Sequence, residues 1–343
     1  MGKIVVLLHT ESDDTLGRPA LEALTTARWL AADLNSEFVV ALVGGSVQEA
    51  AGLAAGAGAS AIYVVEGTDF HQARYSSDAA ALDALCRRAE ADLVVAPGTS
   101  RWNRVLPGIA CRLGGRIDTH VCDINVEGGA PVVTRWYYRQ RMKARIGRAQ
   151  RPWFIVCDPG SFAAFEGPAK ETSIEPVSTP LAEAGFKTEV GGFQKPAGGG
   201  QTIRPDAELL FVAGAGWTKK QPDGNVRVGD AETLILSFLE STRASLGGSK
   251  SMVDLSSEGQ ETLSCMTHLN QIGQTGATPR HPKGLSTCCH GEEPHVVGWR
   301  FINERRAVNL DPNCGWAQGK ADVLYVGDAF EIISKVNDLL AEG

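Results

Sequence analysis

Several features that would place this chain in a specialised class of protein are missing from its sequence. No apolar run approaches the ~20 residues that a membrane-spanning helix needs. The amino terminus has only a strand's length of apolar residues and lacks the small-residue cleavage site of a signal peptide. Lysine and arginine number 33 against 40 acidic residues, and the net charge of -7 lacks the basic excess of nucleic-acid-binding proteins. We therefore expect no membrane span and no nucleic-acid partner.

The eight cysteines lack the spacing of a disulfide framework, which in a chain of this length is typical of the reducing cytoplasm. Five of them stand in apolar surroundings and are expected to be small core residues: Cys86, Cys111, Cys122, Cys157 and Cys265. The adjacent pair Cys288-Cys289, with His290 and His295, offers soft metal ligands. Ligands in zinc sites usually stand two or more residues apart, however, so a metal site is a minor alternative here.

The first half of the chain alternates short apolar runs with helical patterns, which predicts an α/β domain with a mostly parallel sheet. Strands are predicted at 3–9, 37–43, 61–65, 92–96, 120–126, 131–138, 143–149 and 152–157. After Pro19, apolar residues recur at helical spacing and predict a buried helix stripe: Leu21, Leu24, Ala27, Trp29, Leu30 and Leu34.

Proline and glycine are concentrated at 159–202, a composition typical of a domain boundary and of a hinge. We predict an N-terminal domain at 1–190, a Gly/Pro linker at 191–206 and a second domain at 207–343. In the second domain, strands predicted at 208–212, 306–310 and 322–326 end at or near turn-forming residues. Each domain is thus expected to be an open, mostly parallel sheet flanked by helices, and such sheets bind ligands at the carboxyl ends of their strands.

Residues 135–151 form the most cationic part of the chain and contain no acidic residue. The cations are Arg135, Arg139, Arg141, Lys143, Arg145, Arg148 and Arg151. One interpretation is a solvated sheet edge, since charged edge strands resist pairing with other chains. The other is a docking surface for an acidic protein partner, favoured by electrostatic steering.

The segment Gln271–Gly276 reads Gln-Ile-Gly-Gln-Thr-Gly. Its two glycines let the backbone approach a ligand closely, and a hydroxyl and an amide are available to bind a planar heterocycle. It is followed by Leu-Ser-Thr-Cys-Cys-His-Gly-Glu-Glu-Pro-His at 285–295, which predicts a strand end and a glycine turn. Together the two stretches indicate a ligand site in the second domain.

In their order, these segments resemble the alpha subunit of electron transfer flavoproteins over nearly the whole chain. The Gln-Ile-Gly-Gln-Thr-Gly run is similar to the flavin-loop signature of that family, and Ala-Val-Asn-Leu-Asp-Pro at 307–312 is similar to its Ile-Asn-Lys-Asp-Pro stretch. Further segments that carry the resemblance lie at 3–8, 91–100, 106–114 and 321–330.

The resemblance implies an FAD held by a Rossmann-like second domain, in a heterodimer with a beta subunit that packs mainly on the N-terminal domain. By position, Thr275 would hydrogen-bond the flavin N5, His295 would lie at the pyrimidine edge, and Asn309 and Asp322 would hold the adenosine end. The other cofactor-binding residues implied are Ser249, Lys250, Gln271, Gly273, Gln274, Gly276, His290 and Gly291.

The chain also departs from the family pattern near the expected cofactor. Where the family has Gly-Gly-Arg-Gly, residues 213–216 read Ala-Gly-Ala-Gly, so an arginine is missing. The Ser-Arg pair at the flavin is Ser249-Lys250, and lysine keeps the charge but loses the planar fork of arginine. Glu292 and Glu293 place two acids where a diphosphate would pass, which is expected to weaken FAD binding unless they turn outward.

The function implied is that of an electron carrier rather than a substrate-converting enzyme. Electrons would pass through FAD from a donor dehydrogenase, with amine and N-methyl amino acid enzymes as candidates, to a quinone-linked respiratory acceptor. The alternative is a structural subunit that has lost FAD and serves as a scaffold in a larger dehydrogenase complex. No residue needs to act as an acid or a nucleophile, so no catalytic residue is predicted.

Overall fold

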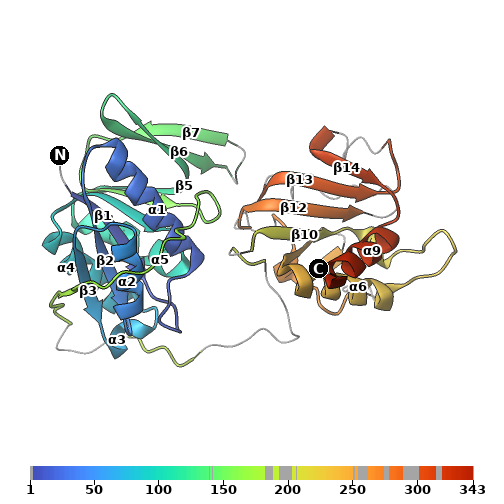
Figure 1. Ribbon diagram of the computed structural model, residues 1–343, viewed down its shortest axis with the longest axis horizontal. Helices are drawn as coiled ribbons and strands as arrows, with labels where there is room; N and C mark the ends of the chain where they lie inside the picture. The colour runs from blue at the N-terminus through green and yellow to red at the C-terminus, as the bar shows by residue number, and fades with distance from the viewer. Residues whose placement is uncertain are drawn as a thin grey trace. The chain divides into compact units, whose positions relative to one another are not determined.

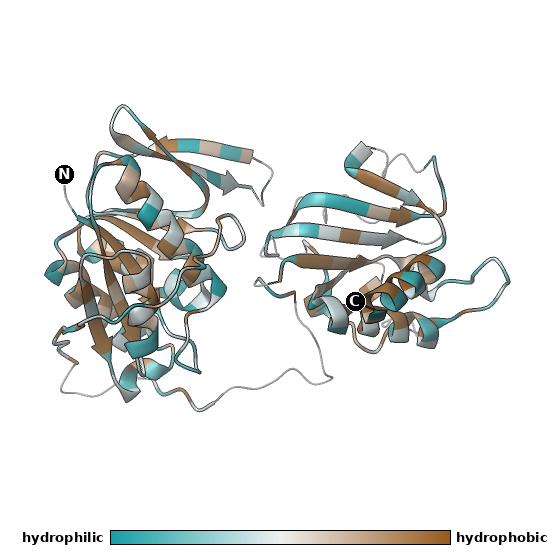
Figure 2. Cartoon of the chain, viewed as in Figure 1, coloured by the Kyte–Doolittle hydropathy of each residue, from teal (hydrophilic) through white to brown (hydrophobic). Residues whose placement is uncertain are grey.

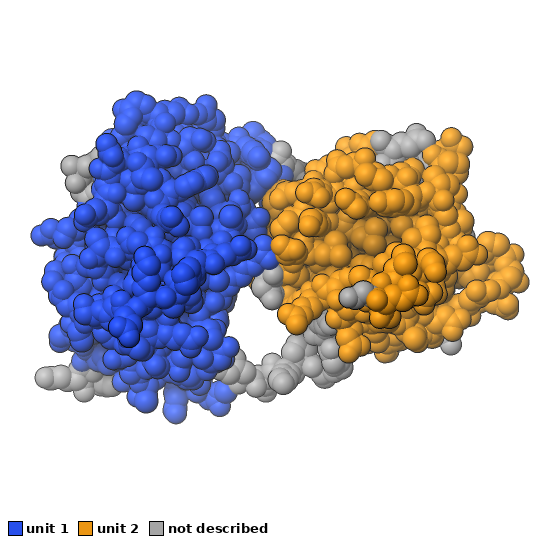
Figure 3. All heavy atoms as spheres, viewed as in Figure 1, with its two compact units in different colours: residues 1–193 blue, residues 194–343 orange. Residues whose placement is uncertain are grey.

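The computed structural model describes most of the chain as two compact units, Met1–Phe193 (unit 1) and Gln194–Gly343 (unit 2) (Figures 1 and 3). The described residues are 3–138, 140, 142–181, 188–192, 203–205, 207–249, 252–253, 262–273, 278–288, 301–313 and 319–342, without the side chain of Cys288. The division falls inside the predicted linker, most of which lies outside these ranges, so the linker stays a prediction. Among the described residues, no helix has the length and apolarity to cross a membrane.

Unit 1 is built on a nine-stranded sheet whose order is β7-β6-β5-β8-β4-β1-β2-β3-β9. Its pairs are parallel except β5 with β6 and β6 with β7. Its strands are β1 (Lys3–His9), β2 (Phe38–Gly44), β3 (Ile62–Glu66), β4 (Ala91–Pro97), β5 (Arg116–Glu127), β6 (Ala130–Tyr137), β7 (Met142–Gly147), β8 (Trp153–Cys157) and β9 (Glu175–Pro176). Its helices are α1 (Arg18–Asp33), α2 (Gln48–Gly56), α3 (Thr68–His71), α4 (Tyr75–Arg88) and α5 (Ser100–Arg112).

The central strand β1 is buried on both faces, which explains its nearly continuous apolar sequence. Ile4 and Leu8 pack in the core that α1 and α2 cover. Val5 and Leu7 pack in the core that α4 and α5 cover. The helices therefore flank both faces of the sheet, and the predicted α/β class of unit 1 is confirmed.

The first helix begins where the sequence predicts, with Pro19 in its first turn. Its stripe is buried at Leu24, Ala27 and Leu30, but Trp29 is 54% exposed. The inclusion of Trp29 in the stripe was wrong, because each residue advances ~100° around an α-helix and position 29 falls off the 24–27–30 line.

The cysteine prediction holds for two of the five residues and fails clearly for one. Cys86 and Cys157 are buried, and burial raises the pKa of each thiol to about 12. Cys111 is exposed, because it follows the buried pair Ile109 and Ala110 on α5 and so turns away from the core. Cys122 and Cys265 are half-buried.

Unit 2 is a five-stranded, all-parallel sheet in the order β11-β10-β12-β13-β14. Its elements are β10 (Leu209–Ala213), η1 (Ala215–Thr218), α6 (Val228–Thr242), β11 (Ser245–Gly248), η3 (His268–Asn270), β12 (His281–Cys288), β13 (Ile302–Asn309), β14 (Val323–Val326) and α9 (Ala329–Glu342). Helices α6 and α9 pack on one face (Figure 1). In Figure 2, β10 is hydrophobic along its length, whereas the middle of β13, Asn-Glu-Arg-Arg at 303–306, is hydrophilic.

The cationic stretch of unit 1 forms the β6–β7 hairpin and the segment after it, and acids from elsewhere in the chain pair with it. Asp118 of β5 is fully buried and accepts hydrogen bonds from Arg135 (3.2 Å), from Arg148 (2.6 and 2.9 Å) and from the Trp153 indole (2.9 Å). Likewise, Arg145 pairs with Glu127 and Arg151 with Asp92. Ion pairs of these arginines thus stabilise the packing of the hairpin on the sheet. Arg139 and Arg141 lie outside the described residues.

Removing the charge at the centre of this network is expected to destabilise unit 1. Asp118→Asn leaves Arg135 and Arg148 facing a neutral amide, which should lower the free energy of unfolding by about 3 kcal/mol. Urea unfolding followed by far-UV circular dichroism measures the change. Asp123→Asn, at an exposed position on the same strand, serves as the control and should alter stability by less than about 0.5 kcal/mol.

The difference in stability between wild type and Asp118→Asn should also depend on pH. Burial alone would raise the pKa of Asp118, but the hydrogen bonds from Arg148 and Trp153 hold it below the usual value. A lowered pKa stabilises the fold above about pH 4, and this contribution is lost as the pH falls through the lowered pKa. The stabilities of wild type and Asp118→Asn should therefore converge on acidification; a constant gap down to low pH would contradict the ion-pair role.

Candidate functional site

The parallel strands of unit 2 all end at the same edge of the sheet, which we call the carboxyl edge. From β10 the chain passes to β11 on one side and then to β12 on the other. The strand order therefore reverses between β10 and β12. In open α/β sheets, ligands bind outside the carboxyl ends of the strands at such a reversal. This point is the candidate site.

A single hydroxyl fixes the backbone at the reversal. Thr287 Oγ1, near the end of β12, accepts a hydrogen bond from Trp217 Nε1 (2.8 Å) and donates one to the carbonyl of Val212 on β10 (3.0 Å). The backbone N–H of Gly214 donates to the carbonyl of Thr287 (2.8 Å). Trp217 is fully buried, with its ring centroid 4.6 Å from that of Phe330. The turn after β10 is therefore held against β12.

This turn contains the position at which the related family carries an arginine. Ala215 occupies it, and its side chain is 4% exposed within the same core as Trp217. Alanine offers no charge to a ligand at the carboxyl edge, and the nearest cations along the chain are Lys219 and Lys220, which follow the η1 turn.

On the other side of β10, two segments meet at the end of β11. The backbone N–H of Ser249 donates to the carbonyl of Ala213 (3.1 Å), and Ser249 Oγ accepts from the N–H of Met252 (3.4 Å). The N–H of Ile272 donates to the carbonyl of Gly248 (3.1 Å), and Gln271 bridges to the same glycine. The structure therefore brings Ser249 and Gln271 together beside the reversal point.

The glycines here permit the close approach of the second segment. A Cβ atom on Gly247 would lie 2.6 Å from Ile272 Cδ1. Gly273 has a φ of 78°, in the left-handed region that glycine adopts without strain. Its N–H donates to Thr278 Oγ1 (2.8 Å), which holds Gly273 close to Thr278. A side chain at either glycine would disturb these contacts.

Most of the residues implied at the flavin ring lie outside the described residues. They are Lys250, Gln274, Thr275, Gly276, His290, Gly291 and His295, together with the acids Glu292 and Glu293. Cys289 lies outside as well, so the alternative metal site is left untested. No group of three metal-ligating side chains is found within the described ranges.

Two polar side chains on the face of the sheet opposite α6 and α9 are buried, and each has an atom without a hydrogen-bond partner among the described residues. Asn309 at the end of β13 is 0% exposed, and Ser286 on β12 is 2% exposed. Asn309 Oδ1 accepts from the N–H of Asp311 (3.0 Å), but Asn309 Nδ2 and Ser286 Oγ make no hydrogen bond among the residues that the structure describes. Ser286 is the register partner of Ala307, two residues before Asn309, so both side chains share one face.

A buried polar group without a partner costs about 1–3 kcal/mol, so such groups call for an explanation. A bound ligand with acceptor atoms would supply the missing partners. The donor set and its position fit a nucleotide cofactor that binds across the reversal point.

The structure separates Asp322 from Asn309, which the resemblance placed together at the adenosine end. Asp322 precedes β14; its Oδ2 accepts from the N–H of Arg305 (2.6 Å) and its own N–H donates to the Arg305 carbonyl (2.8 Å). Asn309 instead pairs in register with Val326, the last residue of β14. At ~3.3 Å per residue, Asp322 lies more than 10 Å along the strand from the carboxyl edge.

Asp328 is the acidic residue that the structure places at the carboxyl end of β14. Its Oδ1 accepts from the N–H of Phe330 (2.7 Å) at the start of α9, and the preceding Gly327 donates its N–H to the Asn309 carbonyl (3.0 Å). The sequence analysis missed it. The signal was present, because an Asp between a strand end and an apolar helix is typical of an N-cap.

The strand order of unit 1 also reverses, between β1 and β4. At this point the side chain of His9 is buried. His9 is 4% exposed; its Nδ1 donates to the Thr10 carbonyl (3.1 Å) and its Nε2 accepts from the Thr99 hydroxyl (2.8 Å). The ring lies edge-on to Trp102 at 4.8 Å. Burial, and then the charge of Arg101, lowers the pKa of His9 to about 4, so the imidazole is neutral at neutral pH.

Comparison with known proteins identifies the family of this chain. Residues 4–182 match the family described as electron transfer flavoprotein domain. The electron transfer flavoprotein subunit alpha of Thermoanaerobacterium thermosaccharolyticum is 23% identical over 335 residues, which cover 96% of this chain and 96% of that protein. The family match lies in unit 1, whereas the similarity to the subunit extends through unit 2 and its carboxyl edge. The chain therefore belongs to the electron transfer flavoprotein family, as a divergent relative of its alpha subunits.

Proposed function

We propose that this chain is an electron transfer flavoprotein alpha subunit that holds FAD at the carboxyl edge of unit 2. The observation that carries the proposal is the pair of unpartnered buried groups, Asn309 Nδ2 and Ser286 Oγ, beside the strand reversal. They would donate to oxygen or nitrogen acceptors of the dinucleotide. Membership of the family supports a flavin as the cofactor.

Ser249, Gln271 and Gly273 would form the wall of the site on the β11 side, where the structure brings them together. The loop closed by Gly273 and Thr278 would carry Gln274, Thr275 and Gly276 to the flavin ring. Lys250 and His295 would supply positive charge near the ring, with His290 and Gly291 in the turn between. Asp322 is left out of the site, because it lies at the other end of β14.

When bound, FAD supplies the ability to accept and pass on electrons, and the protein supplies its position and electrostatics. A cation near the ring favours the added negative charge and so raises the reduction potential. The missing arginine at Ala215 removes one such cation from the edge. We therefore expect Lys250 and His295 to provide the positive charge that remains in this part of the site.

The proposed partners follow from this role. A beta subunit would pack mainly on unit 1 to form the heterodimer, in keeping with the subunit name of the relative. A donor dehydrogenase, with amine or N-methyl amino acid enzymes as candidates, would reduce the flavin, and a quinone-linked acceptor would reoxidise it. The linker at 191–206 would serve as the hinge between the units. The cytoplasmic location stays a prediction that rests on the cysteine pattern.

One observation favours the second candidate function, a scaffold without FAD. The position of the family arginine is occupied by a buried, uncharged alanine. A scaffold subunit would keep the fold and the beta-subunit interface and would lose the cofactor.

The visible absorption spectrum of the chain co-expressed with its beta subunit separates these two functions. A flavoprotein should show bands near ~450 nm that remain after gel filtration, because the cofactor absorbs there. The spectrum of the released cofactor after acid precipitation should identify FAD. A colourless heterodimer that assembles normally would support the scaffold instead.

Asn309→Asp tests the group that carries the proposal. The substitution keeps the shape and the acceptor for Asp311 but replaces the buried amide donor by a carboxylate. It should weaken FAD binding about tenfold or more, as judged by flavin fluorescence during dilution. Asn303→Asp makes the same chemical change at an exposed position near the other end of β13 and is expected to leave FAD binding unchanged. Equal affinities in the two variants would contradict the role of Asn309.

Lys250→Met tests the proposed source of positive charge at the ring. Loss of a nearby cation makes added negative charge less favourable, so the midpoint potential of the bound flavin should fall. Reductive titration against a reference dye measures the potential. Lys335→Met, on the exposed face of α9, is the control and should leave it unchanged. A midpoint potential equal to that of wild type would contradict the proposed role of Lys250.

A further inference from the structure

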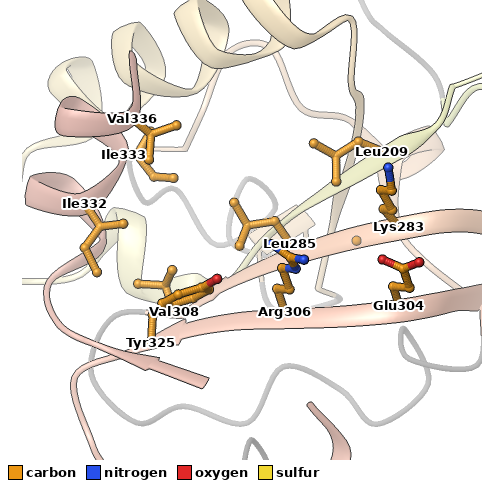
Figure 4. A pocket seen from close by; sticks show the side chains of 11 residues that line it. Leu209, Lys283, Leu285, Glu304, Arg306, Val308, Tyr325, Ile332, Ile333 and Val336 are labelled. Carbon is orange, nitrogen blue, oxygen red and sulfur yellow. The ribbon is translucent and has the colours of Figure 1, made fainter. Parts of the chain in front are cut away.

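A groove of about 490 Å³ lies beside α9, on the face of the unit-2 sheet opposite Asn309 and Ser286 (Figure 4). Its volume is within the ~300–1,000 Å³ range of small-molecule sites. Most of its wall is apolar, contributed by β10, β12, β13 and α9: Leu209, Leu285, Val308, Ile332, Ile333 and Val336. The groove is therefore separate from the proposed cofactor site.

The charged side chains of the groove are arranged by strand register. Lys283 on β12 is the direct partner of Glu304 on β13, an opposite-charge pair across adjacent strands. Arg306, two residues further along β13, faces the apolar Leu285 and not an acid. This leaves Arg306 as the surplus cation of the groove. No ion pair or hydrogen bond of its guanidinium is found within the described part of the chain.

A second polar group points to the same part of the groove. Tyr325 on β14 pairs in register with Val308, so it stands diagonally across from Arg306. Figure 4 shows the Tyr325 hydroxyl directed toward the region of the Arg306 guanidinium. The hydroxyl and the guanidinium both offer hydrogen-bond donors over an apolar floor, and the carboxylate of Glu304 lines the same groove.

The chemistry of this donor set selects an anion with an apolar tail. A guanidinium presents two parallel N–H donors that match the two oxygens of a carboxylate. The hydroxyl of a tyrosine can donate a further hydrogen bond to the same group. An aliphatic chain that extends from this head would lie along α9 against Ile332 and Val336.

We propose that the groove binds a small amphipathic carboxylate, with its head on Arg306 and Tyr325 and its aliphatic tail along α9. Two cations, Lys283 and Arg306, and one acid, Glu304, line the groove, so its charged side chains carry a net positive charge. The site is independent of FAD and of any electron transfer. Coverage of the groove by a protein partner is the competing explanation, and titration in the presence of the beta subunit distinguishes the two.

Isothermal titration of the full-length chain with octanoate tests the proposal. Octanoate should bind, while octanol and octylamine, which lack the anionic head, should bind at least about tenfold more weakly. Butanoate should also bind more weakly, since less of its chain is removed from water. Arg306→Gln should weaken octanoate about tenfold or more. Lys335→Gln, which removes the same charge from α9 outside the groove, should have no effect.

Two further variants keep the proposal open to refutation if Arg306→Gln folds poorly. Tyr325→Phe removes only the hydroxyl and should weaken octanoate several-fold, whereas Val336→Ser should reduce the advantage of octanoate over butanoate. Circular dichroism confirms the fold of each variant. The proposal is overturned if octanol binds as tightly as octanoate, if Arg306→Gln matches Lys335→Gln, or if no acid binds. It is also overturned if the beta subunit abolishes octanoate binding, which would assign the groove to a protein interface.

Discussion

The hydroxyl of Thr287 is the interaction on which the candidate site depends. It accepts from the Trp217 indole and donates to the Val212 carbonyl, and so joins β12, β10 and the turn after β10. Because all three are buried, loss of the hydroxyl would leave a donor and an acceptor unpaired at the point where the strand order reverses. The reversal gives the crevice its position, and this hydroxyl fixes the backbone that borders it.

The two units differ in the polar side chains that stand at the reversal points of their sheets. In unit 1 the reversal between β1 and β4 is occupied by a neutral, buried histidine whose two ring nitrogens both have partners. In unit 2 the edge beside the reversal keeps two buried polar atoms, Ser286 Oγ and Asn309 Nδ2, that have no hydrogen-bond partner among the described residues. Where the buried polar groups of a crevice are already hydrogen-bonded, none is left to bind a ligand. Where they lack partners, a ligand that supplies those hydrogen bonds is bound more favourably. This contrast is the physical reason for placing the cofactor in unit 2.

The sequence predicted those features that depend on local pattern. Apolar runs and helical spacing located β1, α1 and the two-domain α/β class, which the structure confirms. It could not predict the Asp118 network, because the carboxylate stands 17 and 30 residues from the arginines it binds. The choice between Asp322 and Asp328 was within reach of the sequence, because a residue that follows a strand lies at its carboxyl end and one that precedes it lies at its amino end.

Strand β13 shows how one short segment can serve both faces of a sheet. Its side chains alternate, so Glu304, Arg306 and Val308 line the groove beside α9 while Ala307 and Asn309 face the proposed cofactor. A strand buried on both faces of a parallel sheet normally reads as a continuous apolar run, as β1 does. The Asn-Glu-Arg-Arg part of β13 is mostly exposed, so its charged side chains meet solvent, whereas Ala307, Val308 and Asn309 are buried. The exposed half of the strand therefore supplies the charged side chains of the groove, and the buried half supplies Val308 to its apolar wall and Asn309 to the opposite face.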